Sequence, residues 1–304
     1  MRILVTGSAG RVGRAIYIKL MRSHDVVGID KTPCSTVDFV GDIRDISLIH
    51  KALKNIDVII HTAALHAPHV GLITDSEFQS INVDATEQLA LAGINAGIKH
   101  FIFTSTTALY GYASTPEGAA GWVNERVIPQ PKSIYHKSKI AAEHKLEDIS
   151  NRLGIPVTVL QMSRCFPEPA DLMAVFRLTR GIDARDVANA HLCAVEKRLG
   201  GFNRFIISGA TSFSPSDCQA LYMDAASIIS QKCPQLAAAF DKRGWKLPER
   251  LDRVYDSSSA QNRLGWLPIH GFESVLEMLD AETAEVLPVS CAANKLLKTD
   301  PSPF

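Results

Sequence analysis

A tyrosine and a lysine four residues apart are the pair in this sequence best placed to do chemistry. Tyr135 and Lys139 lie in the run YHKSK, and hydroxyl side chains gather upstream at 104–107. On a helix, residues at this spacing stand on one face, and a nearby ammonium favours the phenolate form of a phenol whose free pKa is about 10. We therefore expect Lys139 to make Tyr135 a proton-transfer group near neutral pH. A partly buried tyrosine above a surface lysine gives the same spacing, so the pair needs support from other motifs.

Three glycines near the start of the chain have the spacing of a phosphate-binding turn. Gly7, Gly10 and Gly13 follow a short apolar run and open a helical pattern, as G-x-x-G-x-x-G rather than the G-x-G-x-x-G fingerprint. Glycine lets the backbone approach a pyrophosphate, and a helix N-terminus supplies free N–H groups. Asp30 ends the second apolar run, where its carboxylate can accept hydrogen bonds from ribose hydroxyls. Together these features predict a bound NAD.

Asp30 also predicts NAD rather than NADP, because its carboxylate would repel a 2′-phosphate. Lys31 and Arg11 favour NADP, since either side chain could reach that phosphate. We give Asp30 the greater weight, because long basic side chains can turn into solvent.

The elements that must position these groups alternate along the first half of the sequence. Apolar runs bounded by turn residues predict strands, and helix-like segments separate them. This order predicts an α/β fold, a Rossmann-type doubly wound parallel sheet that binds ligands beyond the carboxyl ends of its strands. The predicted strands are 2–5, 25–29, 37–40, 57–61, 100–104 and 157–161, and the predicted helices are 12–22, 46–53, 86–96 and 135–153.

The second half is less regular and predicts a smaller, mainly substrate-binding part. We expect an NAD-binding Rossmann domain over 1–165, completed by a strand near 202–208, then the substrate-binding part over 166–287. Helical patterns there cover 216–230 and 272–285. Three prolines interrupt residues 288–304, which predicts a loosely ordered tail.

Composition excludes several classes of partner. The 304 residues include 32 basic and 32 acidic side chains, so the charge gives no sign of a nucleic-acid or membrane surface. The apolar run before Gly7 is too short for a signal peptide, and none approaches the roughly 18 residues of a membrane span. Six scattered cysteines without a C-x-x-C pair predict reduced thiols in a cytoplasmic protein.

Several motifs together resemble those of the extended short-chain dehydrogenases/reductases, which include NAD-dependent sugar epimerases and dehydratases. The resemblance covers roughly residues 1–280. It rests on TGSAGRVG (6–13), GDIRD (41–45), HTAA (61–64), INVDAT (81–86), FTSTTALYG (103–111), YHKSK (135–139), ARDVANAH (184–191) and RLGWLP (263–268).

The resemblance implies roles for individual residues. Tyr135 would be the acid/base, Thr106 would hold the reacting oxygen, and Lys139 would bind the nicotinamide ribose and tune Tyr135. Asp42 would accept from the adenine amino group. The implied cofactor-binding residues are Gly7, Gly10, Arg11, Val12, Gly13, Asp30, Lys31, Asp42, Ile43, Ala63, Ala64, Thr104, Tyr135 and Lys139. The weaker candidates for substrate contact are His66, Ser105, Thr107, Arg164 and Phe166.

Two departures from the family pattern narrow the chemistry. The 4,6-dehydratases carry an Asp-Glu pair after the active threonine, and here Thr107 and Ala108 hold those places, so that elimination is not expected. Phe166 precedes the R-D-V-A motif at Arg185 by only 19 residues, which leaves little chain for a nucleotide clamp and favours a small substrate. The longer stretch 213–253 could supply the clamp instead. A short C-x-P-E-P piece at 165–169 is similar to uronate dehydrogenases, which oxidise a free sugar acid.

We therefore expect an NAD-dependent oxidoreductase that moves a hydride between nicotinamide and a carbinol of a sugar or sugar-acid substrate. A 4-epimerase uses the same residues and stays open, and a non-catalytic NAD-binding regulator is a third reading. We also expect a homodimer through the helices that start near 86 and 135. Its apolar face would be Leu89, Ala90, Ile94, Ile140 and Leu146, unless these residues only pack on the sheet.

Other groups of residues carry weaker signals. His61, His66 and His69 cluster without a clear carboxylate or thiol partner, so we expect no metal site. Guanidinium groups pair bidentately with carboxylates and phosphates, although most surface arginines are simply solvated. The candidates for binding an anionic substrate in this way are Arg164, Arg177 and Arg180.

Overall fold

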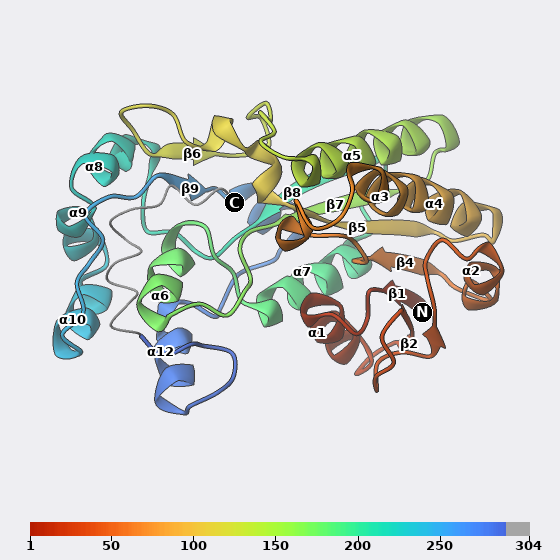
Figure 1. Ribbon diagram of the computed structural model, residues 1–304, viewed down its shortest axis with the longest axis horizontal. Helices are drawn as coiled ribbons and strands as arrows, with labels where there is room; N and C mark the ends of the chain where they lie inside the picture. The colour runs from red at the N-terminus through yellow and green to blue at the C-terminus, as the bar shows by residue number, and fades with distance from the viewer. Residues whose placement is uncertain (290–304) are drawn as a thin grey trace.

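A parallel sheet with helices on both faces forms the centre of the protein (Figure 1). The structure is a computed structural model that describes residues 1–289, so residues 290–304 of the predicted tail lie outside the described part. Within it, seven parallel strands pair in the order β3-β2-β1-β4-β5-β7-β8, which confirms the predicted doubly wound α/β fold. These strands are β1 (Arg2–Thr6), β2 (Asp25–Asp30), β3 (Phe39–Val40), β4 (Val58–His61), β5 (His100–Thr106), β7 (Val157–Met162) and β8 (Phe202–Ile207).

The strands are apolar on both faces because helices bury both. Ile3 and Leu4 are neighbours in β1 and both fully buried, yet they belong to the two different core clusters, one on each side of the sheet. One layer contains α2 (Ile46–Ala52), α4 (Ala85–Asn95) and α5 (Ile134–Leu153). The other contains α1 (Arg11–Leu20), α7 (Ala184–Lys197) and α11 (Ser258–Leu264).

A third core cluster holds the C-terminal part together. It draws on helices that lie beside one end of the sheet in Figure 1. They are α6 (Ala170–Thr179), α8 (Cys218–Met223), α9 (Ala225–Lys232), α10 (Pro234–Lys242) and α12 (Phe272–Asp280). A small parallel pair, β6 (Gly121–Val123) and β9 (Arg253–Tyr255), joins the two halves of the chain. Single helical turns and short helices complete the described part: η1 (Ala67–His69), α3 (Asp75–Gln79), the π-helix η2 (Ser80–Asp84), η3 (Thr107–Tyr110), η4 (Tyr112–Ser114) and η5 (Pro215–Asp217).

The order of the strands fixes where a ligand can bind. The chain runs outward from β1 to β3, then returns to β4 on the other side of β1, so the strand order reverses between β1 and β4. Ligands of such sheets bind at this reversal, beyond the carboxyl ends of the strands. The glycine turn follows β1, and the predicted hydroxyl cluster ends β5. Both motifs therefore lie at the same edge of the sheet.

Two predictions about larger organisation stay predictions. β8 pairs with β7 over six residues at the edge of the sheet, but the division into an NAD-binding and a substrate-binding part is not decided by this pairing. In the structure of the single chain, Leu89, Ala90 and Leu146 of the predicted dimer face are buried in the core, and Ile94 and Ile140 are partly buried. This burial leaves the homodimer little apolar surface on that face. Separately, none of the described helices combines the length and apolar character needed to cross a membrane.

Candidate functional site

A cavity of about 1610 Å³ lies at the carboxyl ends of β1, β4 and β5 and continues into the C-terminal part. Pockets for small molecules are usually about 300–1,000 Å³, so this one has room for a cofactor and a second ligand. Apart from Asp42 and Arg177, every residue that the sequence implicates in cofactor or substrate binding lines it.

The glycine turn forms a backbone cradle at one end of the cavity. Gly7 has φ of 70°, a conformation that favours glycine, and a Cβ on Gly13 would lie 2.0 Å from the Gly7 carbonyl oxygen. Gly10 caps α1 without a side-chain hydrogen bond, so the first-turn N–H groups of the helix have no side-chain cap. Free donors at a helix N-terminus bind phosphate, so this cradle fits the pyrophosphate of a dinucleotide.

Asp30 lies where the sequence places it, at the end of β2 beside this turn. Its Oδ2 accepts from the Ala9 N–H at 3.1 Å and its Oδ1 from the Thr32 N–H at 2.9 Å. Each carboxylate oxygen has a second lone pair, so both can still accept from ribose hydroxyls. The carboxylate is thus held by backbone donors at the lip of the cradle.

The two basic residues that would favour a 2′-phosphate each have an acidic partner. Lys31 Nζ lies 2.8 Å from Asp42 Oδ2, and Arg11 Nη2 lies 2.5 Å from Glu285 Oε2. Glu285 follows α12, in a segment that bonds back to the start of α6 through Leu287 and the Ala170 N–H. These pairs are partly exposed and therefore weak, but each gives the cation an acidic partner within the protein.

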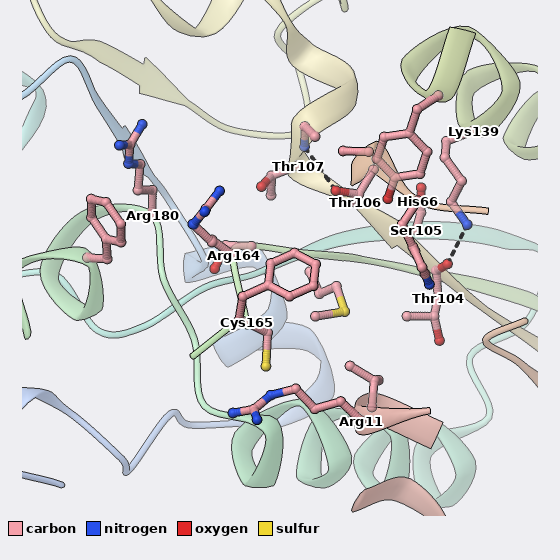
Figure 2. A pocket seen from close by; sticks show the side chains of 18 of the residues that line it. Arg11, His66, Thr104, Ser105, Thr106, Thr107, Lys139, Arg164, Cys165 and Arg180 are labelled. Atoms are coloured by element: carbon pink, nitrogen blue, oxygen red, sulfur yellow. Dashed lines mark hydrogen bonds between the residues drawn. The ribbon is translucent and has the colours of Figure 1, made fainter. Parts of the chain in front are cut away.

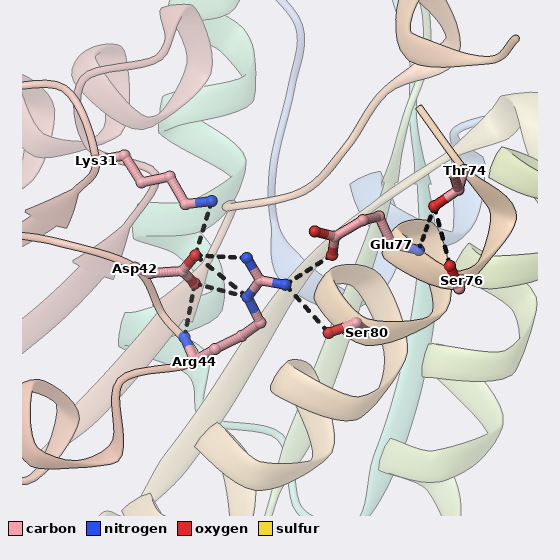
Figure 3. Close-up of polar contacts among 7 residues, drawn as sticks. All are labelled: Lys31, Asp42, Arg44, Thr74, Ser76, Glu77 and Ser80. Carbon is pink, nitrogen blue, oxygen red and sulfur yellow. Dashed lines mark hydrogen bonds and ion pairs between the residues drawn. The ribbon is translucent and has the colours of Figure 1, made fainter. Parts of the chain in front are cut away.

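Asp42 is part of an ion-pair network, and its implied contact with the adenine stays a prediction. Its carboxylate pairs with Lys31 and with Arg44, and Arg44 continues to Glu77 and Ser80 near the π-helix (Figure 3). The hydrogen bonds from Arg44 hold the pKa of Asp42 far below its usual range. The neighbouring Ile43 does line the cavity, whereas the Asp42 side chain is taken up by this network.

Thr106 and Tyr135 meet at the cavity wall. Thr106, labelled in Figure 2, is the last residue of β5, and Tyr135 is the second residue of α5. The centre of the Tyr135 ring lies 6.3 Å from that of His66. Burial raises the pKa of Tyr135 to about 12, and a hydrogen bond from Thr106 offsets part of that rise. The expectation that the pKa of Tyr135 lies near neutral pH does not hold in the protein alone, because burial has the largest effect on it.

Lys139 lies against the end of β5. Its Nζ donates to the Thr104 carbonyl at 2.8 Å and lies 4.0 Å from the centre of the Phe103 ring. Burial lowers the pKa of Lys139 to about 7, although Glu143 acts in the opposite direction. The amine therefore lies close to its titration point at neutral pH.

The hydroxyls beside Thr106 have partners inside the protein. Ser105 Oγ donates to Glu143 at 2.5 Å, and Thr104 Oγ1 lies 2.8 Å from Nε2 of His191. The Thr107 carbonyl accepts from the Tyr255 hydroxyl at 3.3 Å. Thr106, at the cavity wall, thus has the geometry to contact a substrate oxygen, whereas the Thr104 and Ser105 hydroxyls bond to partners inside the protein.

Asn82 is a site residue to which the sequence analysis gives no role. It lies in the π-helix η2, and its amide accepts from Leu65 N–H at 2.7 Å and donates to the Leu65 carbonyl and to Ser138 Oγ, both at 3.0 Å. Ser138 in turn donates to the Tyr135 carbonyl. Asn82 therefore ties the Ala63–Ala64 loop to the helix of Tyr135, and its INVDAT motif was the available signal. π-Helices are rare and recur at functional sites.

The three arginines proposed as anion ligands have different surroundings. Arg180 and Arg253 share Asp252, at 3.4 and 2.6 Å, and both line the cavity. Arg164 also lines it and pairs with Glu168, whereas the 2% exposed Arg177 pairs with Asp183 and does not line it. Of the three candidates, Arg177 is therefore not placed to contact a ligand in this cavity.

The far end of the cavity is rich in cations. Residues 164–253 contribute five basic and three acidic side chains to its lining, and Lys132 adds a sixth cation. Arg250 stacks on Tyr222 with 4.4 Å between the guanidinium carbon and the ring centre, and Lys246 lies in the same region of the chain. The stretch 213–253 thus reaches the cavity. The sequence analysis names this stretch but none of its side chains.

The three histidines do not form a metal site. His61 is buried between Thr6 and Thr86, at 2.6 and 2.9 Å, and burial lowers its pKa to about 3. The backbone N–H of His66 donates a hydrogen bond to Nδ1 of His69. Among residues 1–289, no group of three or more histidine, cysteine, aspartate or glutamate side chains is placed to hold a metal ion.

Curated relatives include sugar-nucleotide enzymes and steroid dehydrogenases. UDP-glucose 4-epimerase of Streptomyces lividans is 24% identical over 88% of this chain and 91% of its own length. The mouse dTDP-D-glucose 4,6-dehydratase is 29% identical over 54% of this chain, and the vaccinia virus (strain Ankara) 3 beta-hydroxysteroid dehydrogenase/Delta 5-->4-isomerase is 31% identical over 48%. The matches span only 50% and 46% of those two relatives.

Solved structures have the same fold. A short-chain dehydrogenase/reductase superfamily protein from Agrobacterium tumefaciens with bound NAD has a TM-score of 0.69 at 19% identity, over 92% of this chain and 96% of that one. MoeE5 in complex with UDP-glucose and NAD has a TM-score of 0.66 at 21% identity, over 93% and 99%. The sequence model of the NAD dependent epimerase/dehydratase family matches residues 3–169, more than half of the chain. With the cavity, the glycine cradle and the Thr106–Tyr135 pair in place, this chain belongs to the NAD dependent epimerase/dehydratase family.

Proposed function

We propose that this protein is an NAD-dependent oxidoreductase acting on a carbinol of a sugar-type substrate that carries an anionic group. The observation that carries the proposal is that Thr106, Tyr135 and Lys139 share one cavity with the glycine cradle. A cofactor in the cradle and a substrate at the cation-rich end would meet at Tyr135.

The residues present fit NAD. Gly7, Gly10 and Gly13 leave room for a pyrophosphate, and Asp30 is held where it can accept from the adenosine ribose hydroxyls. Ile43 and Ala63 would line the two nucleoside ends. When bound, NAD supplies the acceptor and donor of a hydride, and the protein supplies position and electrostatics.

The chain's own residues handle the proton. Tyr135 Oη takes the proton of the substrate hydroxyl as the carbinol is oxidised, and Thr106 Oγ1 holds the same oxygen. Because the pKa of Tyr135 is raised by burial, the phenolate needs a cation close by when the substrate reacts. Lys139 is the cation one turn away on the same helix, and it must turn from the Thr104 carbonyl toward the ribose and Tyr135.

The lining supports an anionic substrate. Arg180 and Arg253 together carry two positive charges against the single carboxylate of Asp252, and Arg253 also donates to Ser114 Oγ at 3.1 Å. Unpaired guanidinium N–H groups can hold a carboxylate or phosphate bidentately. A sugar acid is a small substrate whose carboxylate could pair with these arginines. The reach of 213–253 into the cavity also supports a nucleotide sugar, although the segment after Phe166 is short.

Two other outcomes use the same fold. An epimerase would return the hydride after the ketone rotates, with the same three residues, and the Streptomyces lividans relative favours it. Elimination of the 4,6-dehydratase kind is not proposed, because Thr107 and Ala108 provide no carboxylate. A non-catalytic NAD-binding regulator would not need Thr106, Tyr135 and Lys139 together. We place the protein in the cytoplasm, since the five described cysteines are free thiols, and keep the homodimer as a prediction.

Replacing Tyr135 by phenylalanine should abolish most turnover and leave NAD binding nearly unchanged. General acid-base groups contribute about 100- to 10,000-fold, so kcat should fall within that range. The measurement is absorbance at the reduced-nicotinamide band with sugars and sugar acids, alongside a titration of NAD. Tyr17→Phe, on the outer helix α1, is the control and should behave as wild type. Near-normal turnover in Tyr135→Phe would refute the mechanism.

The anionic end should discriminate substrates by charge. Calorimetry should show tighter binding of a hexuronic acid than of the neutral hexose. Arg180→Gln should lower the affinity for the hexuronic acid about 10- to 100-fold, which corresponds to the loss of a charged hydrogen bond. Arg243→Gln is the matched control, because Arg243 is a partly buried arginine that pairs with Asp280 and does not line the cavity.

Uridine and thymidine diphosphates belong in the same titration. Tight binding of either would refute a small substrate and promote the epimerase. Equal binding of the acid and the neutral sugar would contradict the assignment of the cation-rich end.

Cofactor choice should follow Asp30. Wild-type protein should prefer NAD, because Lys31 and Arg11 are paired with carboxylates and Asp30 faces the 2′ position. Asp30→Ala should narrow the preference for NAD over NADP, because it weakens the binding of NAD and removes the repulsion of the NADP 2′-phosphate. Fluorescence titrations of both cofactors measure it, with Asp25→Ala at the other end of β2 as control. Tighter binding of NADP by the wild type would show that the basic residues dominate.

A further inference from the structure

A buried carboxylate lies one helical turn beyond the site lysine. Glu143 follows Lys139 by four residues in α5, so the two side chains stand on one face of the helix. Lys139 is 2% exposed and Glu143 is 3% exposed. Charges removed from water in this way need an opposite charge or hydrogen bonds close by.

The two side chains hold two consecutive residues of β5. Lys139 Nζ donates to the Thr104 carbonyl at 2.8 Å, and Ser105 Oγ donates to Glu143 Oε1 at 2.5 Å. Thr106 follows directly and presents its hydroxyl to the cavity (Figure 2). The pair therefore fixes the strand end on which the proposed substrate contact depends.

Glu143 is also the partner of a second cation. Arg204 on β8 donates from Nε to Glu143 Oε2 at 2.7 Å, and Gln161 on β7 donates to both carboxylate oxygens at 3.0 and 3.1 Å. The Tyr110 hydroxyl holds Gln161 in place at 2.7 Å. Arg204 has a longer contact of 3.8 Å to Glu147. Glu143 thus contacts Arg204 directly and stands one helical turn from Lys139.

The other groups that face Lys139 bring no negative charge. They are His61 on β4 and His66 after it, the Phe103 ring and the Thr104 carbonyl on β5, and Tyr135 on α5 itself. Within residues 1–289, Glu143 is the carboxylate that raises the pKa of Lys139 against the effect of burial.

We propose that Glu143 is a positioning residue that keeps Lys139 charged as its buried counter-ion, and that Arg204 limits this effect by sharing the same carboxylate. The proposal rests on the proposed function in one respect: the charge of Lys139 affects turnover only if Lys139 acts on Tyr135 and the cofactor ribose. The counter-ion relation itself is a property of the free protein.

Two substitutions should shift the pKa of Lys139 in opposite directions. Glu143→Gln keeps the size and removes the negative charge, so the pKa of Lys139 should fall below its value of about 7. Arg204→Gln leaves Glu143 to Lys139 alone, so that pKa should rise. Opposite charges at close range shift a pKa by about 1–3 units, and we expect about one unit in each direction.

The experiment is an NMR titration of the lysine ¹³Cε signals in the protein without substrate. The Lys139 signal is assigned by its loss in Lys139→Met. Glu147→Gln is the matched control, because Glu147 lies one turn further along α5 and is 44% exposed. In this variant the titration midpoint of Lys139 should equal that of the wild type. Thermal unfolding and NAD binding check that each variant folds. If Arg204→Gln does not fold, the double variant with Glu143→Gln removes both charges of the pair, and its Lys139 signal should titrate as in Glu143→Gln.

Opposite shifts of the Lys139 midpoint support the proposal. Unchanged midpoints, or shifts of the same sign in both variants, overturn it, because repacking alone gives no reason for opposite signs. With a substrate in hand, the alkaline limit of turnover should move with each midpoint. If the midpoints of the two variants shift in opposite directions but the wild-type protein turns over no substrate, the proposed function is refuted and the counter-ion assignment stands.

Discussion

The burial of Lys139 against the end of β5 is the contact on which the site depends. An amine without water is tolerated there because the Thr104 carbonyl and the Phe103 ring contact it and Glu143 stands one turn away on the same helix. The same contact holds α5 against β5, and so brings Tyr135 of the helix to Thr106 of the strand. Replacing the lysine would therefore disturb both the charge and the geometry of the proposed proton-transfer group.

The cavity combines two ends of different chemistry. At one end, backbone N–H groups and the carboxylate of Asp30 offer a site for a dinucleotide, and the basic residues nearby are paired with acids. At the other end, arginines such as Arg180 and Arg253 outnumber their acidic partner Asp252. The carboxyl ends of the parallel strands make a rigid floor between them, so a substrate's reacting carbon and the cofactor can be held at one place.

Local spacing predicts the features that depend on one turn or one helix. The glycine turn, the Tyr135–Lys139 pair and the strand–helix alternation were visible because each is short in sequence, and the doubly wound fold is confirmed. The direction of the Tyr135 pKa was wrong because burial comes from distant segments and cannot be derived from i, i+4 spacing. Arg253 was missed for a related reason: its place depends on the pairing of β9 with β6, more than a hundred residues away.

A crystal structure of the NAD complex tests the central claim most directly. The account predicts the pyrophosphate on the glycine turn and the nicotinamide ring beside Tyr135 and Thr106. It also predicts that Lys139 Nζ has left the Thr104 carbonyl for the nicotinamide ribose. A nicotinamide that lies away from Tyr135, or a lysine that keeps its contact with β5 and does not touch the ribose, would contradict it.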